Sequence, residues 1–200
     1  DLTDGNSEIL MANRNGRAIR FHESTVRQMG RVSSGVRGMK LDDGDDAVVG
    51  MVCMEPGSEN TVMNISEKGY GKRSLLEDYR VTNRGGKGVK TMNITDRTGH
   101  LVALMSVNDN NDLVIINKSG ITLRLHVADL RVMGRATQGV RLINLEKRND
   151  EIASVCCVEA DDEAEAEVIE AMQEELPMTP EEEPENETPE EEWHEEEPEE

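Results

Sequence analysis

Aromatic residues are nearly missing from this chain: they make up 2% of its 200 residues, and only Phe21, Tyr70 and Tyr79 precede the last 42 positions. Val, Ile, Leu and Met must therefore build any core, and stacking of bases on aromatic rings cannot be a main binding mode. No apolar run approaches the roughly 18 residues of a transmembrane helix, and no signal peptide is visible. The sequence therefore predicts a soluble, cytoplasmic protein without membrane contact.

Cysteine and histidine are also scarce and form no recognisable site. Cys53 and Cys157 both fall 37 residues after a repeated glycine, where a third copy has Ser106, and this is typical of a small buried strand residue. Their spacing supports neither a disulfide framework nor a zinc site. The histidines are widely separated and lie in no carboxylate or serine constellation: His22, His100, His126 and His194. We therefore expect no catalytic residue, no metal site and no cofactor in this chain.

Basic residues are absent from the end of the chain, although the formal net charge of −20 hides this. Residues 1–158 contain all 22 Lys and Arg against 20 acidic residues, whereas residues 159–200 contain 22 acidic residues. A block of one charge sign with little to bury is typical of a disordered interaction tail. We expect a folded part over 1–158 and a disordered acidic tail over 159–200, with at most a transient helix over 163–176 and an exposed Trp193.

The folded part contains three copies of one pattern, each with a glycine as origin: Gly16, Gly69 and Gly120, which are 53 and 51 residues apart. Counted from that glycine, basic residues recur at the +4 position (Arg20, Arg73, Arg124), the +11 position (Arg27, Arg80, Arg131), the +15 position (Arg31, Arg84, Arg135) and the +21 position (Arg37, Lys90, Arg141). Folded repeats carry equivalent residues to equivalent places in space. These twelve residues should therefore form an extended basic surface.

Each copy reads as four short strands. In the first copy these are residues 8–13, 17–21, 35–41 and 47–54, and Asn15-Gly16 supplies a hairpin turn. Four strands in about 50 residues indicate an all-β, propeller-like array with repeats over about 8–54, 60–107 and 112–158. A solenoid is the alternative, although its repeats are usually shorter. Three blades cannot close a ring, and the chain starts at Asp1 without a methionine, so we expect a C-terminal fragment of a longer protein.

The repeated basic positions have two interpretations. In the first, they only pair with acids such as Glu23, Asp78 and Asp129, which would contribute little. However, Asp and Glu recur far less regularly than Arg, so the pattern is not half of a repeated salt-bridge ladder. In the second, a row of regularly spaced Arg neutralises the phosphates of a bent double-stranded DNA without reading its bases.

A glycine-rich stretch, Thr82–Gly88, is a second candidate site. Its backbone N–H groups, between Arg84 and Lys87, could form a cradle for a phosphate. The alternative is a flexible turn before a strand, because the equivalent loops of the other copies have a single glycine. A fainter likeness to a nucleotide-binding P-loop over Gly69–Ser74 fails, because the Gly-Lys pair lacks a following Ser or Thr.

Several long stretches in the right order resemble one family: Asn15–Phe21, Ser24–Arg27, Gly35–Gly38, Gly69–Arg73 and Gly134–Val140. Over about residues 8–158 they are similar to the C-terminal domain of the A subunit of bacterial DNA gyrase, a type IIA DNA topoisomerase. The resemblance implies a β-pinwheel, here about three four-stranded blades that exchange strands with neighbours and wrap DNA around a basic perimeter. The catalytic tyrosine would lie upstream, so the chain itself would be non-catalytic.

The resemblance also implies a role in the whole enzyme. That enzyme would be a bacterial, nucleoid-associated A2B2 heterotetramer that supercoils DNA negatively, with ATP and Mg²⁺ on its B subunits. The family's wrapping motif, Gln-Arg-Arg-Gly-Gly-Lys-Gly, lies in its first blade. Thr82–Gly88 matches it at five of seven positions, with Thr82 and Asn83 differing, and is expected to be a sister copy. The expected DNA-binding residues are the twelve repeated ones and Lys87.

Two alternatives remain at this point. The C-terminal domain of the corresponding A subunit of topoisomerase IV has a similar ring with fewer, more divergent blades, although a long acidic tail favours gyrase. A propeller of the regulator-of-chromosome-condensation type has repeats of similar length and would dock proteins instead of DNA.

Overall fold

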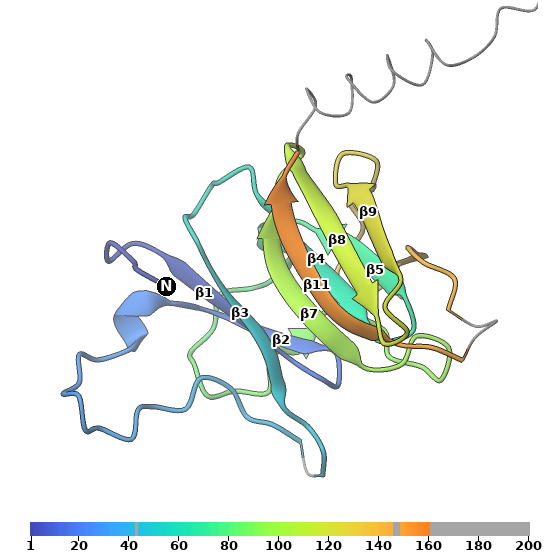
Figure 1. Ribbon diagram of the computed structural model, residues 1–200. Coiled ribbons are helices and arrows are strands. Elements are labelled where there is room, and N and C mark those ends of the chain that lie inside the picture. Colours follow the sequence, from blue (N-terminus) through green and yellow to red (C-terminus); the bar gives the residue numbers. More distant parts are fainter. Residues whose placement is uncertain (43, 146–148, 161–200) are drawn as a thin grey trace, which may run out of the picture. The chain divides into compact units, whose positions relative to one another are not determined.

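The computed structural model describes residues 1–42, 44–145 and 149–160, which form three antiparallel sheets (Figure 1). The strands are β1 (Glu8–Asn13), β2 (Arg17–His22), β3 (Val48–Met54), β4 (Thr61–Ser66), β5 (Tyr70–Ser74), β6 (Val89–Lys90), β7 (Leu101–Val107), β8 (Asn111–Asn117), β9 (Thr122–His126), β10 (Val140–Arg141) and β11 (Ile152–Glu159). Two short 3₁₀ turns, η1 (Glu23–Thr25) and η2 (Leu76–Asp78), follow β2 and β5. Over these ranges no helix has the length and apolar character to cross a membrane. The acidic tail from residue 161, with its predicted helix and Trp193, lies outside the described residues.

The hairpin of β1 and β2 shows how the sequence builds each sheet. Gly16 adopts a positive φ of 75°, which the tight turn demands and which glycine takes without strain. The backbone N–H of Arg17 donates a hydrogen bond of 2.7 Å to the side-chain oxygen of Asn13, and this bond closes the turn between β1 and β2. The resulting register places Ala12 opposite Ala18, and both are fully buried.

Each of the first two sheets takes its fourth strand from the next repeat. The strand order is β3-β1-β2-β6 in blade 1 and β10-β5-β4-β7 in blade 2, while blade 3 has β11-β8-β9. Thus Val89 and Lys90 of the second repeat pair with β2, and Val140 and Arg141 of the third repeat pair with β5. The strand exchange that the resemblance implied is therefore present, and it ties consecutive blades together by backbone hydrogen bonds.

The predicted third strand over 35–41 is wrong for the first repeat, since this segment is not a strand. Its counterparts β6 and β10 become strands only because the preceding blade offers them an edge, and among the described residues no blade precedes the first repeat. The segment instead contacts the glycine-rich loop: Gly85 N–H donates to Gly38 O at 2.5 Å and Lys40 N–H donates to Gly86 O at 2.8 Å. The third repeat supplies the four predicted strands, but its sheet has three within the described residues because β10 pairs with blade 2.

The apolar core lies between consecutive blades. One buried cluster joins Leu10 and Val52 of blade 1 to Val62 and Leu101 of blade 2. A second cluster joins Met63 and Ile65 of blade 2 to blade 3, through Leu113, Ile115 and Ile152. Aliphatic side chains dominate both clusters, as the scarcity of aromatic residues predicted. These two clusters are therefore buried by the packing of consecutive blades, whereas a third cluster, of Ile19, Phe21 and Met39, is buried within the first repeat.

The two edges of each sheet have different surroundings. The strands β3, β7 and β11 each form one edge of their own sheet, and β7 contacts both β3 and β11. The donated strands β6 and β10 form the opposite edges of blades 1 and 2. Residues at the +21 position, Lys90 and Arg141, lie on these opposite edges.

Replacing Gly88 with Ala should destabilise the chain far more than replacing Gly35, which holds the same position in the first repeat. Both glycines have positive φ, 71° and 82°, so both variants carry a similar backbone strain of about 1 kcal/mol. A methyl group on Gly88 would also collide with the carbonyl of Ala18, whereas one on Gly35 meets nothing within 4 Å. Gly88→Ala should therefore lose a further ~1–3 kcal/mol in chemical denaturation. Equal losses would contradict the docking of β6 on β2.

Candidate nucleic-acid interface

The +4 arginine of the first repeat is built into the contact between blades 1 and 2. The Arg20 side chain is 10% exposed and forms an ion pair with Glu8 on the neighbouring strand. Its Nη1 donates hydrogen bonds across the junction to the carbonyls of Leu76 at 2.7 Å and Tyr79 at 2.9 Å. These carbonyls lie at the 3₁₀ turn η2 of the second repeat. Arg20 therefore stabilises the blade junction, and its guanidinium is occupied within the protein.

The equivalent Arg73 is also buried, but it lacks the carboxylate that the other repeats provide. Glu8 and Asp112 occupy the same repeat position in blades 1 and 3, where blade 2 has Thr61. Arg73 pairs instead with Asp109, at 2.5 Å, whose side chain is 69% exposed. The buried Nε of Arg73 has no hydrogen-bond partner among the described residues. The direct DNA contact predicted for Arg20 and Arg73 does not fit these positions.

In the third repeat the +4 residue, Arg124, is more open. Its side chain is 39% exposed and pairs at 2.5 Å with Asp112, which is fully buried. His126 Nδ1 lies 2.7 Å from the other carboxylate oxygen. Arg124 is thus anchored from one side while its outer part remains accessible.

The +15 arginines form a second repeated contact between blades. Arg84 donates to the carbonyls of Thr25 at 3.0 Å and Arg37 at 3.1 Å, both in the first repeat. Arg135 donates in the same way to Asp78 at 3.0 Å and Lys90 at 2.7 Å, in the second repeat. Both therefore satisfy carbonyls at the end of a 3₁₀ turn and at the +21 position of the preceding repeat. Arg31 has no preceding repeat among the described residues and is exposed.

The +11 and +21 residues are exposed in all three repeats: Arg27, Arg80, Arg131, Arg37, Lys90 and Arg141. The +11 residues of the first two repeats follow the 3₁₀ turns, and the +21 residues of the last two repeats lie on the donated edge strands. Equivalent places on consecutive blades thus present basic side chains to solvent. The structure therefore separates Arg20, Arg84 and Arg135, which bond across blade junctions, from the +11 and +21 residues, which face outward in every repeat.

A cluster at the junction of blades 2 and 3 adds a residue that the sequence pattern missed. Arg97 and Arg141 both lie over the ring of Tyr70, with guanidinium carbons 5.4 and 5.6 Å from its centroid. Arg97 Nε donates to the Tyr70 hydroxyl at 2.6 Å and Arg141 Nη2 donates at 3.2 Å. Tyr70 therefore holds two positive groups close together. Arg97 lies outside the four repeated positions, so only the fold brings it to Arg141.

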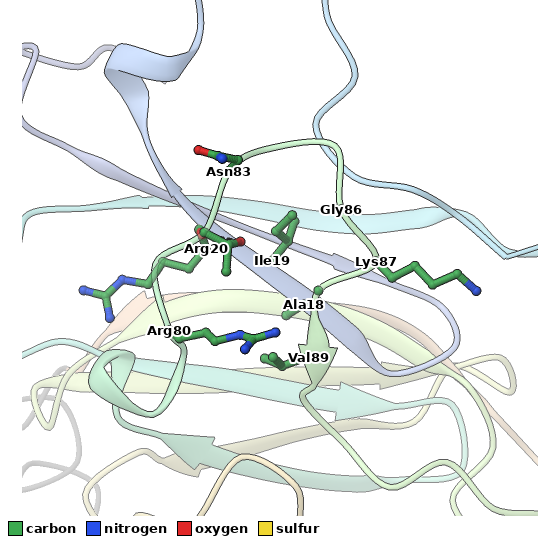
Figure 2. A pocket seen from close by; sticks show the side chains of 10 residues that line it. Ala18, Ile19, Arg20, Arg80, Asn83, Gly86, Lys87 and Val89 are labelled. Atoms are coloured by element: carbon green, nitrogen blue, oxygen red, sulfur yellow. Dashed lines mark hydrogen bonds between the residues drawn. The ribbon is translucent and has the colours of Figure 1, made fainter.

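The glycine-rich stretch borders a shallow cavity of about 280 Å³ against strand β2 (Figure 2). Ala18 and Ile19 line its base, and Arg80 and Lys87 lie on different sides of it. Lys87 extends away from the cavity in Figure 2, and its Nζ pairs with Asp42 at 2.7 Å. That hydrogen bond holds the pKa of the Asp42 carboxyl below its usual value. Since the N–H of Gly85 bonds to the first repeat, it is not available to a phosphate.

Lys72 is a second residue that the pattern missed. It is 1% exposed, and its Nζ donates to the carbonyls of Gly134, at 2.8 Å, and Arg135, with Thr137 Oγ1 at 3.4 Å. The first and third repeats have Ile19 and Leu123 at this position. The sequence could have pointed to Lys72, because a lysine stands there at a repeat position that is apolar in the other two copies.

The tyrosines and cysteines have structural surroundings. Tyr79 is fully buried, and its hydroxyl lies 2.5 Å from Thr91 Oγ1. Burial raises the pKa of Tyr79 and those of the thiols of Cys53 and Cys157. Cys53 and Cys157 occupy equivalent places in β3 and β11, as their spacing predicted, but both are partly exposed, not buried as expected.

Comparison with known proteins gives consistent matches. A family model described as the DNA gyrase C-terminal domain, beta-propeller, matches residues 7–53, 60–108 and 111–158. The A subunit of a DNA gyrase from Staphylococcus aureus (strain MRSA252) is 46% identical over 144 residues, covering 72% of this chain and 16% of that protein. A solved C-terminal domain of DNA topoisomerase IV has a TM-score of 0.73 at 24% identity, covering 88% of this chain and 54% of that one. A solved DNA gyrase A C-terminal domain has a TM-score of 0.67 at 26% identity, covering 76% and 51%.

The missing carboxylate at Thr61 gives a stability prediction. Thr61→Glu should place a carboxylate beside the unpartnered Nε of Arg73, as Glu8 does for Arg20, and raise the free energy of unfolding by about 1 kcal/mol. Thr61→Gln, of the same size without the charge, should gain less than half of that. Urea denaturation midpoints of the two variants and the parent chain measure the difference. A Glu variant no more stable than the Gln variant would contradict the inference that Arg73 lacks a carboxylate partner at this position.

Proposed function

The chain belongs to the DNA gyrase C-terminal domain family, and we propose that it binds double-stranded DNA and wraps it along the exposed basic positions of its blades. The observation that carries this proposal is the division of the repeated residues. Arg20, Arg84 and Arg135 bond across the junctions of consecutive blades, and the +11 and +21 positions present Arg or Lys at equivalent places on each repeat. Phosphates of one duplex can then be neutralised successively from blade to blade.

The chemistry of this surface suits a backbone and not a base sequence. Guanidinium groups are the side chains that best match phosphate geometry, and they contact it without reading base edges. The described part of the chain offers few aromatic rings, and Tyr70 and Tyr79 are both buried. Binding should therefore depend on charge and on bending of the duplex.

In the whole protein, this domain would supply a wrapped duplex to the strand-passing part of gyrase, which introduces negative supercoils. We assign ATP and Mg²⁺ to the B subunits of an A2B2 enzyme, and the breakage chemistry to another part of the A subunit. The chain spans about one sixth of the length of the gyrase subunits that it matches, at 16% of the S. aureus protein. Bacterial cytoplasm, close to the nucleoid, is the location that this role requires.

Wrapping itself can be tested by topology. A nicked plasmid ligated in the presence of excess chain should change its linking number if the bound duplex is wrapped, and should not change if the chain only binds. Reconstitution of the longer protein with the B subunit should give ATP-dependent negative supercoiling. Topoisomerase IV, the alternative enzyme, would relax and decatenate DNA instead. A protein-docking propeller would leave the linking number unchanged in the first assay.

The exposed +11 arginines should carry much of the salt dependence. Replacing Arg27, Arg80 and Arg131 with Ala should weaken duplex binding and reduce the slope of log affinity against log salt by about 0.9 for each lost phosphate contact. Arg14→Ala is the matched control for each single replacement, because it also removes one positive charge, at a residue outside the repeated positions. Fluorescence anisotropy over a salt series measures the duplex affinity and its salt slope for each variant. A triple variant with the parent slope would contradict the proposed interface.

The acidic tail should compete with DNA for the basic surface. Deletion of residues 161–200 removes 21 acidic residues, which are the 22 of residues 159–200 without Glu159. The deletion should tighten duplex binding several-fold at low salt, and the gain should shrink near 0.15 M, where charges are screened beyond about 8 Å. A shuffled tail of the same composition should restore the weaker binding. Unchanged or weaker binding after deletion would count against competition.

A further inference from the structure

We infer that Lys72 is a positioning residue of the proposed DNA interface, which holds the loop carrying Arg135 and couples its own protonation to duplex binding at the junction of blades 2 and 3. This inference rests on the proposed function. It starts from a positive charge that is buried without a carboxylate partner among the described residues, at a place where the other repeats have apolar residues.

The geometry makes Lys72 specific to one junction. Its ammonium projects from β5 of blade 2 and donates to two backbone carbonyls and one hydroxyl, all in residues 134–137 of the third repeat. At the junction of blades 1 and 2, the equivalent Ile19 lies beneath Gly86 of the corresponding loop. At this repeat position the first junction thus has an apolar contact and the second a buried cation.

The held loop lies between residues of the proposed interface. Arg135 lies within it and donates to the carbonyls of Asp78 and Lys90. Arg131 precedes the loop and Arg141 follows it on β10, and both are exposed. A phosphate bound by these exposed groups would lie close to the buried ammonium without touching it.

The charged groups around Lys72 do not neutralise it. Burial lowers its pKa to about 8, Asp78 of η2 opposes this shift, and Arg135 of the loop adds to it. On its own strand the next residue is Arg73, and on the facing strand β4 its register partner is Asn64, which does not titrate. From β10, Arg141 pairs in register with Tyr70. Lys72 therefore titrates near physiological pH with a net positive environment.

The direction of the linkage follows from these values. In an unfolded chain or an opened loop the lysine regains its ordinary pKa of 10.5, so rising pH between about 8 and 10.5 favours the closed loop. Loss of the proton therefore does not open the junction. A nearby phosphate acts differently, because it stabilises the charged ammonium and raises the pKa of Lys72. Duplex binding should therefore take up a proton, and affinity should fall as pH rises through about 8.

The test measures duplex affinity from pH 7.0 to 9.5 with the full 200-residue chain, its Lys72→Met variant and its Lys118→Met variant. A charge at roughly 10 Å in an effective dielectric of about 20 corresponds to at most about a 15-fold change in affinity. The parent chain and Lys118→Met should therefore lose threefold to tenfold more affinity over this range than Lys72→Met. Lys118→Met controls for removal of an exposed lysine outside the proposed interface. Coincident pH profiles for all three proteins would overturn the inference.

Calorimetry gives a readout that a purely structural role would not move. At pH 8, binding enthalpies in two buffers of different ionisation enthalpy should show uptake of a fraction of a proton by the parent chain and none by Lys72→Met. If Lys72→Met does not fold, Thr137→Val serves instead. It removes one acceptor from the ammonium at similar volume, so the loss of affinity should move to lower pH. An unmoved profile in a folded Thr137→Val variant would also overturn the inference.

The two proposals fail in different ways. If no variant shows salt-dependent duplex binding, the proposed function fails, and this inference fails with it. If binding is salt-dependent but its pH profile ignores Lys72, only the role of Lys72 fails. Lysine side-chain NMR of the DNA-free chain adds an independent check, because an ammonium titrating near 10.5 would remove the basis of the inference.

Discussion

The second and third repeats each give a two-residue strand to the sheet of the repeat before them, and the rest of this structure depends on this one constraint. β6 and β10 each pair with the outer strand of the preceding blade, and the glycine before each strand approaches that blade's backbone closely. No blade beside such a strand is complete by itself, so the fold is defined by its junctions. The two larger apolar clusters lie at the same junctions and bury the faces that the paired strands bring together.

The junctions also explain the use of arginine. The two 3₁₀ turns place carbonyls at the blade junctions, and burial of such carbonyls without partners would be costly. Arg20 reaches forward to the turn of the next repeat, whereas Arg84 and Arg135 reach back to the turn of the previous one. One residue type thus serves two purposes, since a guanidinium can satisfy several carbonyls at once and can also face solvent as a permanent positive charge.

The repeats are equivalent in backbone but not in chemistry. Thr61 replaces a carboxylate beside Arg73, Lys72 replaces an apolar residue beneath the loop of the third repeat, and Tyr70 gathers two arginines where the first repeat has Arg17. All three differences fall in β4 and β5 of blade 2 or at their ends. The middle blade therefore carries more unbalanced positive charge than its neighbours, which places the strongest electrostatic features of the proposed interface at the junction of blades 2 and 3.

Much of this protein was determined by the sequence alone. Hairpin glycines and β-branched runs located most strands within a residue or two, because turn chemistry and alternation are local properties. The repeat spacing likewise identified the twelve basic positions, and the family resemblance was carried by contiguous stretches. The segment over 35–41 was assigned wrongly because a strand exists only where another strand offers it an edge, and that edge belongs to a different repeat. Which arginines face outward was decided only by the tertiary structure, since a periodic sequence places residues at equivalent positions without saying whether a neighbouring blade covers them. Burial of Lys72 and the meeting of Arg97 with Arg141 depend on contacts between repeats in the same way, because the groups that surround each side chain come from segments distant in the chain.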